Sequence, residues 1–485
     1  MPARIPVLPI KMDTTSNGEF VPPRLSQREK HINQLADQQI DLGAHRLGLD
    51  RRTFMLSTCA AATTLLCANK VNAAAGLTGG FYQLSGEAAM ETEPADAALM
   101  GDEFIFDIQG HFVDPNGRWL NQLPEQATPF AGMPGAACSL ADIPGDRSYL
   151  QCLGPKQFVK DVFMDSDTNM MVLSFVPSRR ENEPLTIEEA DATRRIIDEL
   201  EGDQRLLLHG RVNPNQDGDL QGMEELAEKW QVSAWKTYTQ WGPEGQGFFL
   251  HEAPGIAMIE KARQLGVNNI CIHKGIPFGQ QSYEHSLCTD IGIVAKAFPD
   301  INFIIYHSGF DPGVEEQAFN QGAGRAGTDS LVQSLIDNDI APNTNVYAEL
   351  GSTWRFVMRH PEQAAHLLGK LIRYVGENNV LWGTDSIWYG SPQDQIQAFR
   401  SFQISDTFQQ QYGYSSLTPT LKRKIFGLNA TKPYQVSIEE VQRFMGKDRI
   451  ATSKAEYQQA PQPHFKTYGP KTRREFLNLM KWQQG

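Results

Sequence analysis

An eight-stranded parallel α/β barrel, the (β/α)8 or TIM-barrel architecture, is the fold class that the sequence predicts. Apolar, β-rich runs recur along the chain after residue 100, and helical patterns separate most of them. In addition, several runs end in a histidine or an aspartate. A closed parallel barrel gathers such strand-end side chains around one point, so the same pattern predicts both a fold and a site.

Eight runs are present, and most follow one another at intervals that leave room for a crossover helix. They lie near 103–108, 169–176, 205–212, 232–238, 269–273, 301–306, 345–350 and 379–384. Helical patterns occur at 187–200, 256–265, 291–298, 331–336 and 360–374, and Thr186-Ile-Glu-Glu189 predicts a capping box before the first. An open doubly wound sheet is the alternative, although the first run lacks the Gly-rich phosphate turn typical of that fold.

The barrel is expected over 101–435, with two appended segments. Residues 112–167, rich in Pro and Gly, form a long insert after the first strand, which we interpret as a lid or wall over the pocket. An excursion without a role is the alternative. The insert contains Cys138 and Cys152, the pair expected to form a disulfide in an oxidising compartment. Residues 436–485 are expected to be a tail that wraps over the barrel surface.

The N-terminal region predicts an export signal. Arg51 and Arg52 precede an uncharged apolar stretch at 55–68, and the alanines at 73–75 offer a cleavage site. These features predict a twin-arginine signal at 49–75, the twin-arginine translocase as a partner, and a periplasmic or secreted protein. Residues 1–48 are then expected to be a disordered leader. An ordinary buried helix over 54–66 is the alternative.

The composition excludes some classes of function. The chain has 485 residues, enough for a barrel of about 250 residues with appendages. A net charge of −13, with lysine and arginine scattered, argues against a nucleic-acid partner. No Cys-x-x-Cys pair occurs, which argues against a structural zinc cluster.

Polar residues at the strand ends predict a metal centre. Gln109 and His111 are two residues apart and point the same way from the first strand, His273 ends the fifth run, and His307 and Asp385 follow the sixth and eighth. Two or three imidazoles with a carboxylate and one open position are typical of catalytic metal sites, where the cation activates a water. Asp385 would pass the water proton to the leaving group, and His307 would polarise a carbonyl or hold a leaving oxygen.

Four further residues are candidate substrate contacts. Lys236 follows the fourth run and Glu349 ends the seventh, while His251 and Arg355 lie in loops beyond strand ends. Lys236 would pair with a substrate carboxylate or form a salt bridge within the barrel. With nearby tryptophans and arginines, these residues predict a small-molecule substrate that carries a carboxylate or an aromatic ring.

Six motifs together resemble the amidohydrolase superfamily, in its amidohydrolase-related branch, which also includes aminocarboxymuconate semialdehyde decarboxylase and γ-resorcylate decarboxylase. The motifs are Asp107-Ile-Gln-Gly-His111, Trp235-Lys236-Thr-Tyr238, Ile272-His273-Lys-Gly275, Tyr306-His307-Ser-Gly309, Trp382-Gly-Thr-Asp385 and Ile425-Phe-Gly-Leu-Asn429-Ala430. The resemblance covers about residues 103–434. It implies one divalent metal ion, usually Zn2+, at His111, His273 and Asp385, with His307 as a catalytic residue, and often a homodimer.

The chain departs from that pattern at Gln109, where the family usually has a histidine. An amide oxygen is a weaker zinc ligand than imidazole, so Mn2+ or Fe2+ is an alternative ion. The sequence therefore predicts a metal-dependent hydrolase of an ester, lactone or amide. A metal-dependent decarboxylase of an aromatic or unsaturated acid uses the same ligands and is the first alternative. A non-catalytic secreted barrel is the second.

Overall fold

The computed structural model describes residues 6–123, 130, 147–199, 204–321, 326–446 and 448–483. Within this part of the chain, eight parallel strands pair in chain order. They are β2 (Phe106–Gly110), β3 (Met170–Leu173), β4 (Leu206–Arg211), β5 (Ala234–Tyr238), β6 (Asn269–His273), β7 (Asn302–Tyr306), β8 (Val346–Glu349) and β9 (Val380–Leu381). The barrel closes because the amide of Ile108 donates to Trp382 O (3.1 Å) and the amide of Asp385 donates to Gln109 O (2.9 Å). The predicted barrel is confirmed, strand by strand.

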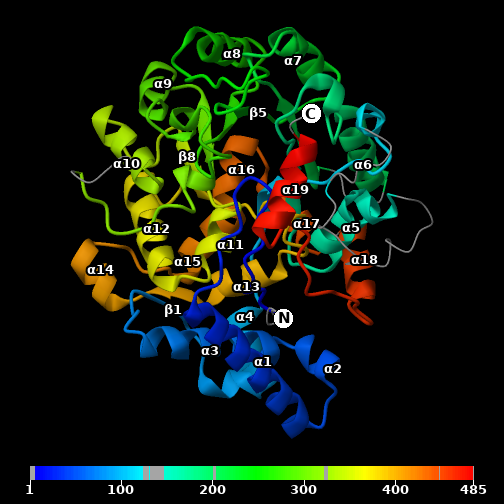
Figure 1. Ribbon diagram of the computed structural model, residues 1–485, viewed down its shortest axis with the longest axis vertical. Coiled ribbons are helices and arrows are strands. Elements are labelled where there is room, and N and C mark those ends of the chain that lie inside the picture. The colour runs from blue at the N-terminus through cyan, green and yellow to red at the C-terminus, as the bar shows by residue number, and fades with distance from the viewer. Residues whose placement is uncertain are drawn as a thin grey trace.

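Helices surround this barrel (Figure 1). They are α6 (Ile187–Glu199), α7 (Asp219–Glu228), α8 (Ala253–Gln264), α9 (Ile291–Ala297), α10 (Thr328–Asp337), α11 (Thr353–Val357), α12 (Pro361–Tyr374) and α13 (Gln393–Ser401). In strand β6, successive side chains point alternately into the barrel and out towards the helices. Cys271 belongs to the cluster inside the barrel, whereas Ile270 and Ile272 belong to the cluster that contains Met258 and Ile259 of α8. His273, two residues beyond Cys271, therefore points into the barrel mouth.

A helical layer precedes the barrel and lies beside it, at the bottom of Figure 1. It contains α1 (Gln27–Leu47), α2 (Arg51–Met55), α3 (Thr58–Ala74) and α4 (Thr92–Leu99), and it joins the barrel where β1 (Gly80–Tyr82) pairs with β10 (Phe402–Ile404). Helix α1 begins with a capping box formed by Ser26 and Glu29. Its Ile32, Ala36 and Ile40 are buried. The expectation of a disordered leader is therefore wrong for this segment, because its apolar residues recur at helical spacing and have a surface to cover.

The apolar stretch at 55–68 is packed within this layer. Ala60, Ala62 and Leu65 of α3 are fully buried, and α3 contacts both α1 and α4. Arg51 pairs with Asp37 at 2.6 Å. This arrangement corresponds to the alternative of an ordinary buried helix. Among the described helices, none combines the length and the apolar character needed to cross a bilayer.

Residues 7–20, which we call the N-terminal strap, run from the helical layer to the centre of the barrel (Figure 1, dark blue). Most of the strap from residue 8 onward is buried, at Leu8, Ile10 and Met12 in particular. Lys11 Nζ lies 3.0 Å from Asp394 Oδ1. An extended segment without regular structure is thus fixed by apolar contacts and by a buried ion pair.

The C-terminal tail also crosses the barrel, as predicted. After α14 (Asp406–Tyr412), α15 (Pro419–Arg423) and α16 (Asn429–Tyr434), the tail forms α17 (Ile438–Phe444), α18 (Arg449–Tyr457) and α19 (Arg473–Gln483). The amides of Tyr468 and Gly469 both donate to Trp388 O at 2.8 Å. The amide of Ser16 donates to Pro470 O at 2.9 Å, so the tail and the strap are joined to each other.

The insert after β2 is described only in part, at 112–123, 130 and 147–167. It includes α5 (Pro155–Val159) and packs around Phe112, Trp119 and Phe158 in a second apolar cluster. Cys152 is buried and disulfide-bonded. Cys138, its predicted partner, lies outside the described residues.

Candidate metal centre

The strand ends bring the predicted site residues together at one mouth of the barrel. Seven of the predicted site residues lie on a barrel strand or within four residues after one. All seven are buried to 97% or more: Gln109, His111, Lys236, His273, His307, Glu349 and Asp385. His307 and Asp385 adopt positive φ angles of 64° and 58°, which turn the chain sharply as it leaves β7 and β9. The convergence predicted from the sequence is therefore present in the structure.

Asp385 is the most heavily hydrogen-bonded of these side chains. Its Oδ1 lies 3.2 Å from His111 Nε2 and accepts from Gln109 Nε2 at 3.2 Å. Its Oδ2 accepts from Ser352 Oγ at 2.5 Å and from Asn17 Nδ2 at 2.8 Å. Burial alone would raise the pKa of Asp385, but its interactions with His111, His307 and Ser352 hold that pKa well below its ordinary value. Asp385 is therefore a carboxylate, and it can accept a proton or a cation.

His273 and His307 form a second group, with ring centroids 4.6 Å apart. His307 Nδ1 bonds the carbonyl of Gly351 at 2.7 Å, and His273 Nε2 bonds the carbonyl of Ile276 at 3.2 Å. Because a carbonyl only accepts, each of these nitrogens carries the ring proton. Burial lowers the pKa of His307 to about 4 and, with the His307 and Lys236 charges, lowers that of His273 well below its ordinary value. Both rings are thus neutral, with one free lone pair each.

Glu19 of the N-terminal strap faces these two lone pairs. Its Oε1 lies 3.6 Å from His273 Nδ1, and its Oε2 lies 3.9 Å from His307 Nε2. Sequence reasoning missed Glu19, because residues 1–48 were expected to be disordered. The apolar residues of the strap at positions 7–12 were the available signal, since such a run needs a surface to cover.

The donor set fits a divalent cation. Buried polar atoms without a hydrogen-bond partner cluster here: Gln109 Oε1, His111 Nδ1, Lys236 Nζ, His273 Nδ1 and His307 Nε2. Among the histidines, cysteines and carboxylates of the described residues, those of Glu19, His273 and His307 offer ligand atoms within 4.8 Å of one another. His111 and Asp385, predicted as ligands, lie beside this group and bond each other. Two imidazoles with one carboxylate are a common donor set for Zn2+ and for Fe2+.

Acidic side chains also outnumber basic ones around this point, and their mutual repulsion together with burial opposes their ionisation. Burial and the Asp385 carboxylate raise the pKa of Glu19 to about 8, and burial raises that of Glu349 to about 8. Lys236, whose pKa burial lowers to about 8, contacts the ring faces of Tyr306 (3.5 Å) and Tyr238. A bound cation would relieve the repulsion among the carboxylates.

Glu349 serves the architecture of the site. Its Oε2 accepts from the amide of His307 at 3.1 Å, and its Oε1 accepts from the amide of Gly351. The carboxylate thereby joins the loops after β7 and β8, and it orients the carbonyl that holds His307.

None of the four predicted substrate contacts, Lys236, Glu349, His251 and Arg355, lines the cavity above the site. Arg355 is buried, and its Nη2 lies 2.6 Å from Asp13 Oδ1 of the strap. His251 is exposed and stacks on Phe249 with ring centroids 5.5 Å apart. The structure thus assigns Arg355 to the attachment of the strap, because its charge is taken up by Asp13.

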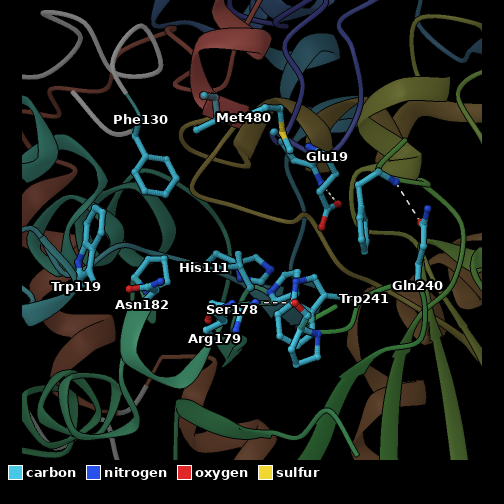
Figure 2. Close-up of a pocket in the computed structure, with 18 of the residues that line it drawn as sticks. Glu19, His111, Trp119, Phe130, Ser178, Arg179, Asn182, Gln240, Trp241 and Met480 are labelled. Atoms are coloured by element: carbon cyan, nitrogen blue, oxygen red, sulfur yellow. Dashed lines mark hydrogen bonds between the residues drawn. The ribbon is translucent and has the colours of Figure 1, made fainter. Parts of the chain in front are cut away.

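A cavity of about 800 Å3 opens above the site. Asn17, Glu19, His111 and Asp385 form its floor. Its lining combines polar side chains, among them Arg179, Asn182, Gln240 and Glu244, with five aromatic ones: Trp119, Phe130, Trp241, Phe278 and Trp388. Figure 2 shows Glu19 and His111 facing the same space, with Trp119 and Phe130 on one side and Trp241 on the other. The insert, the strap and α19 (through Leu479 and Met480) all contribute to the lining, so the described part of the insert is a wall of the pocket.

The chain is similar to several solved structures at low sequence identity. Among curated proteins, none matches the chain significantly. A 2,6-dihydroxybenzoate decarboxylase from Rhizobium is 14% identical, with a TM-score of 0.41 over 69% of this chain and 99% of that one. A 4-oxalomesaconate hydratase from Rhodopseudomonas palustris is 16% identical, with a TM-score of 0.41 over 73% and 99%. A dihydroorotase from Campylobacter jejuni is 13% identical, with a TM-score of 0.38 over 70% and 85%.

The sequence itself carries the assignment. The family model described as amidohydrolase matches residues 190–436, from α6 through the end of the barrel. This match covers just over half of the 485 residues, and it includes Lys236, His273, His307, Glu349 and Asp385. The chain belongs to the amidohydrolase family.

Proposed function

We propose that the protein is a metal-dependent hydrolase that cleaves an ester, lactone or amide bond of a small aromatic substrate, with Zn2+ as its ion. The observation that carries this proposal is the pair of neutral imidazoles, His273 and His307, whose free lone pairs face a carboxylate below an 800 Å3 cavity. A divalent cation bound there supplies a Lewis acid that polarises a carbonyl and activates water near neutral pH.

The residues of this chain supply the other functions that hydrolysis needs. Asp385 lines the cavity, so its carboxylate can accept the proton of the attacking water and return it to the leaving group. Gln109 and Ser352 donate to the same carboxylate and hold its orientation. The aromatic walls exclude water around the substrate, which strengthens each of these electrostatic interactions.

The aromatic side chains of the cavity favour a planar substrate, and Arg179 offers one cation for a carboxylate on it. Trp241, Phe278 and Trp388 offer ring faces for stacking, and Arg179 offers a cation at the rim. The same features favour a second candidate function, decarboxylation of an aromatic acid, in which Arg179 or the cation would hold the carboxylate that is released.

Product analysis distinguishes the two reactions. The full chain, supplied with Zn2+, Mn2+ or Fe2+, would be incubated with aryl esters, aryl lactones, anilides and hydroxybenzoic acids. Hydrolysis releases an acid together with an alcohol or an amine, whereas decarboxylation releases CO2. We expect turnover of an ester, lactone or amide that EDTA abolishes and added metal restores. Metal-dependent CO2 release without hydrolysis would establish the second function, and a protein that binds no metal and turns over neither class would refute both.

Export by the twin-arginine route is a separate proposal, supported by Arg51, Arg52 and the apolar stretch that follows. The predicted cleavage at 73–75 conflicts with the burial of the strap and of α3, because it would remove both. We expect protein purified from its native host, in whichever compartment it is found, to retain residues 7–20. N-terminal sequencing and intact mass measure this directly. A mature protein that begins near residue 76 would show that the strap is absent from the working form.

A further inference from the structure

We propose that the N-terminal strap completes the metal centre, with Glu19 as a ligand to the cation that His273 and His307 bind. The inference rests on the proposed metal dependence and adds a ligand from outside the barrel. It makes residues 7–20 part of the binding machinery.

The spacing of the three side chains supports coordination. In a tetrahedral site with bonds of about 2.1 Å, ligand atoms lie about 3.4 Å apart. The Glu19 oxygens lie 3.6 Å and 3.9 Å from the two free imidazole nitrogens. These separations exceed those of a good hydrogen bond. With one ligand atom from each residue, the three atoms lie within 4.8 Å of one another, so shifts of about 1 Å would place them around one ion. His273 Nδ1 and His307 Nε2 have no hydrogen-bond partner, so the contact with Glu19 leaves both lone pairs available.

The chemistry of β2 explains why a further ligand is useful. Gln109 stands where a histidine is usual in the family, and its Nε2 donates to Asp385. His111 Nε2 also faces Asp385. One nitrogen of each side chain is thereby taken up by Asp385, which leaves Gln109 Oε1 and His111 Nδ1 as the free polar atoms of these two residues. A glutamate from the strap would restore an anionic donor to the site.

The position of Glu19 is defined by the strap on both sides. Asn17 Nδ2 donates to Glu19 Oε2 and to Asp385 Oδ2, and so joins the two carboxylates. Upstream, Asp13 is bound by Arg355 (2.6 Å) and by Thr467 Oγ1 (2.8 Å). Downstream, the aromatic ring of Phe20 is buried against Phe356. Asn17 is therefore a positioning residue for Glu19.

A plug that blocks the site is the competing interpretation. In that case Glu19 would imitate a substrate carboxylate and leave when substrate enters. The cavity favours a ligand, because Asn17, Gly18 and Glu19 form its floor and leave about 800 Å3 open above them. The two interpretations predict opposite effects of neutralising Glu19.

Metal titration of the full chain tests the proposal without reference to catalysis. Metal-free wild type, Glu19→Gln, Glu19→Asp, His273→Ala and the control Glu244→Gln would be titrated with Co2+ by visible absorption and with Zn2+ by calorimetry. Glu244 is a glutamate at the rim of the same cavity. We expect Glu19→Gln to weaken binding by about 100-fold or more, since losing even an outer partner of a ligand costs 10- to 100-fold. The Co2+ spectrum should change, Glu19→Asp should retain part of the affinity, and Glu244→Gln should match wild type.

The other outcomes are equally informative. Loss of binding in His273→Ala with wild-type affinity and spectrum in Glu19→Gln would overturn the role of Glu19 and leave the metal centre intact. Undiminished affinity together with faster turnover in Glu19→Gln would establish the plug. Wild type that binds neither ion would refute the proposed metal dependence itself. Circular dichroism of each variant confirms that the fold is retained.

Discussion

Asp385→Asn is expected to lower kcat by about 1,000-fold, within the range that loss of a general base produces, while the fold is retained. The amide of asparagine cannot accept the water proton, but its oxygen can still accept from Gln109 or Ser352, which donate to the carboxylate in the wild type. The stacking of His111 on Trp388 should persist, since it does not depend on the charge. Turnover with the best substrate found, together with the thermal unfolding midpoint, measures both parts of this expectation.

The exposed Asp217 offers a matched control, because Asp217→Asn removes the same charge away from the cavity. Metal content measured on the same samples separates two roles of Asp385. A variant that keeps its ion but loses turnover has lost a proton acceptor, whereas a variant that loses its ion has lost a ligand. An unchanged rate would remove Asp385 from the mechanism.

Arg355→Leu is expected to destabilise the protein by about 3 kcal/mol, because it removes the nearest cation from a carboxylate at a nearly buried site. Asp13 is the partner, and its side chain is 15% exposed. Burial alone would raise the pKa of Asp13, but the charges of Arg355 and Lys471 lower it from 3.8 to about 2. The ion pair of Asp13 with Arg355 therefore stabilises the fold fully at pH values above the pKa of Asp13 in the unfolded chain. This stabilisation is lost as the pH falls towards 2. The difference between variant and wild type should shrink below about pH 4.

The same substitution should loosen the strap and weaken metal binding. Urea unfolding and Zn2+ titration of Arg355→Leu, Asp13→Asn and the double variant measure both effects. The double variant should be more stable than Arg355→Leu alone, since it leaves no unpaired charge. If the two single effects simply add, Asp13 and Arg355 are not coupled, and the strap is held by its apolar contacts.

The sequence was sufficient to predict the barrel because each strand is a compact apolar run, and a parallel sheet needs little else to be recognised. The sequence also predicted that five side chains lie close together: Gln109, His111, His273, His307 and Asp385. They follow from the fold, because closure of the barrel brings the ends of their strands to the same mouth. These predictions depend on local sequence patterns, and the repeated strand-helix unit of the barrel places the end of each strand at the same mouth.

The contributions from outside the barrel could not be predicted in the same way. The apolar stretch at 55–68 has the composition of an export signal and equally that of a buried helix, and only the surfaces around it decide between the two. Glu19 follows no strand and belongs to no periodic pattern. Arg355 was expected to contact substrate, because its partner Asp13 lies in a segment with no recognisable structure of its own. When two irregular segments that are far apart in the sequence pair with each other, neither contains a local pattern that predicts the contact.

The joining of residues 15–16 to 467–470 has a consequence for biosynthesis. Thr15 Oγ1 lies 2.6 Å from Thr467 Oγ1, so two segments that are far apart in the sequence hold each other across the mouth of the barrel. A nascent chain that has not yet reached residues 467–470 lacks these contacts, although Arg355 and Asp394 can already bind the strap. The strap, and with it the proposed ligand Glu19, would then reach its full attachment only late in synthesis.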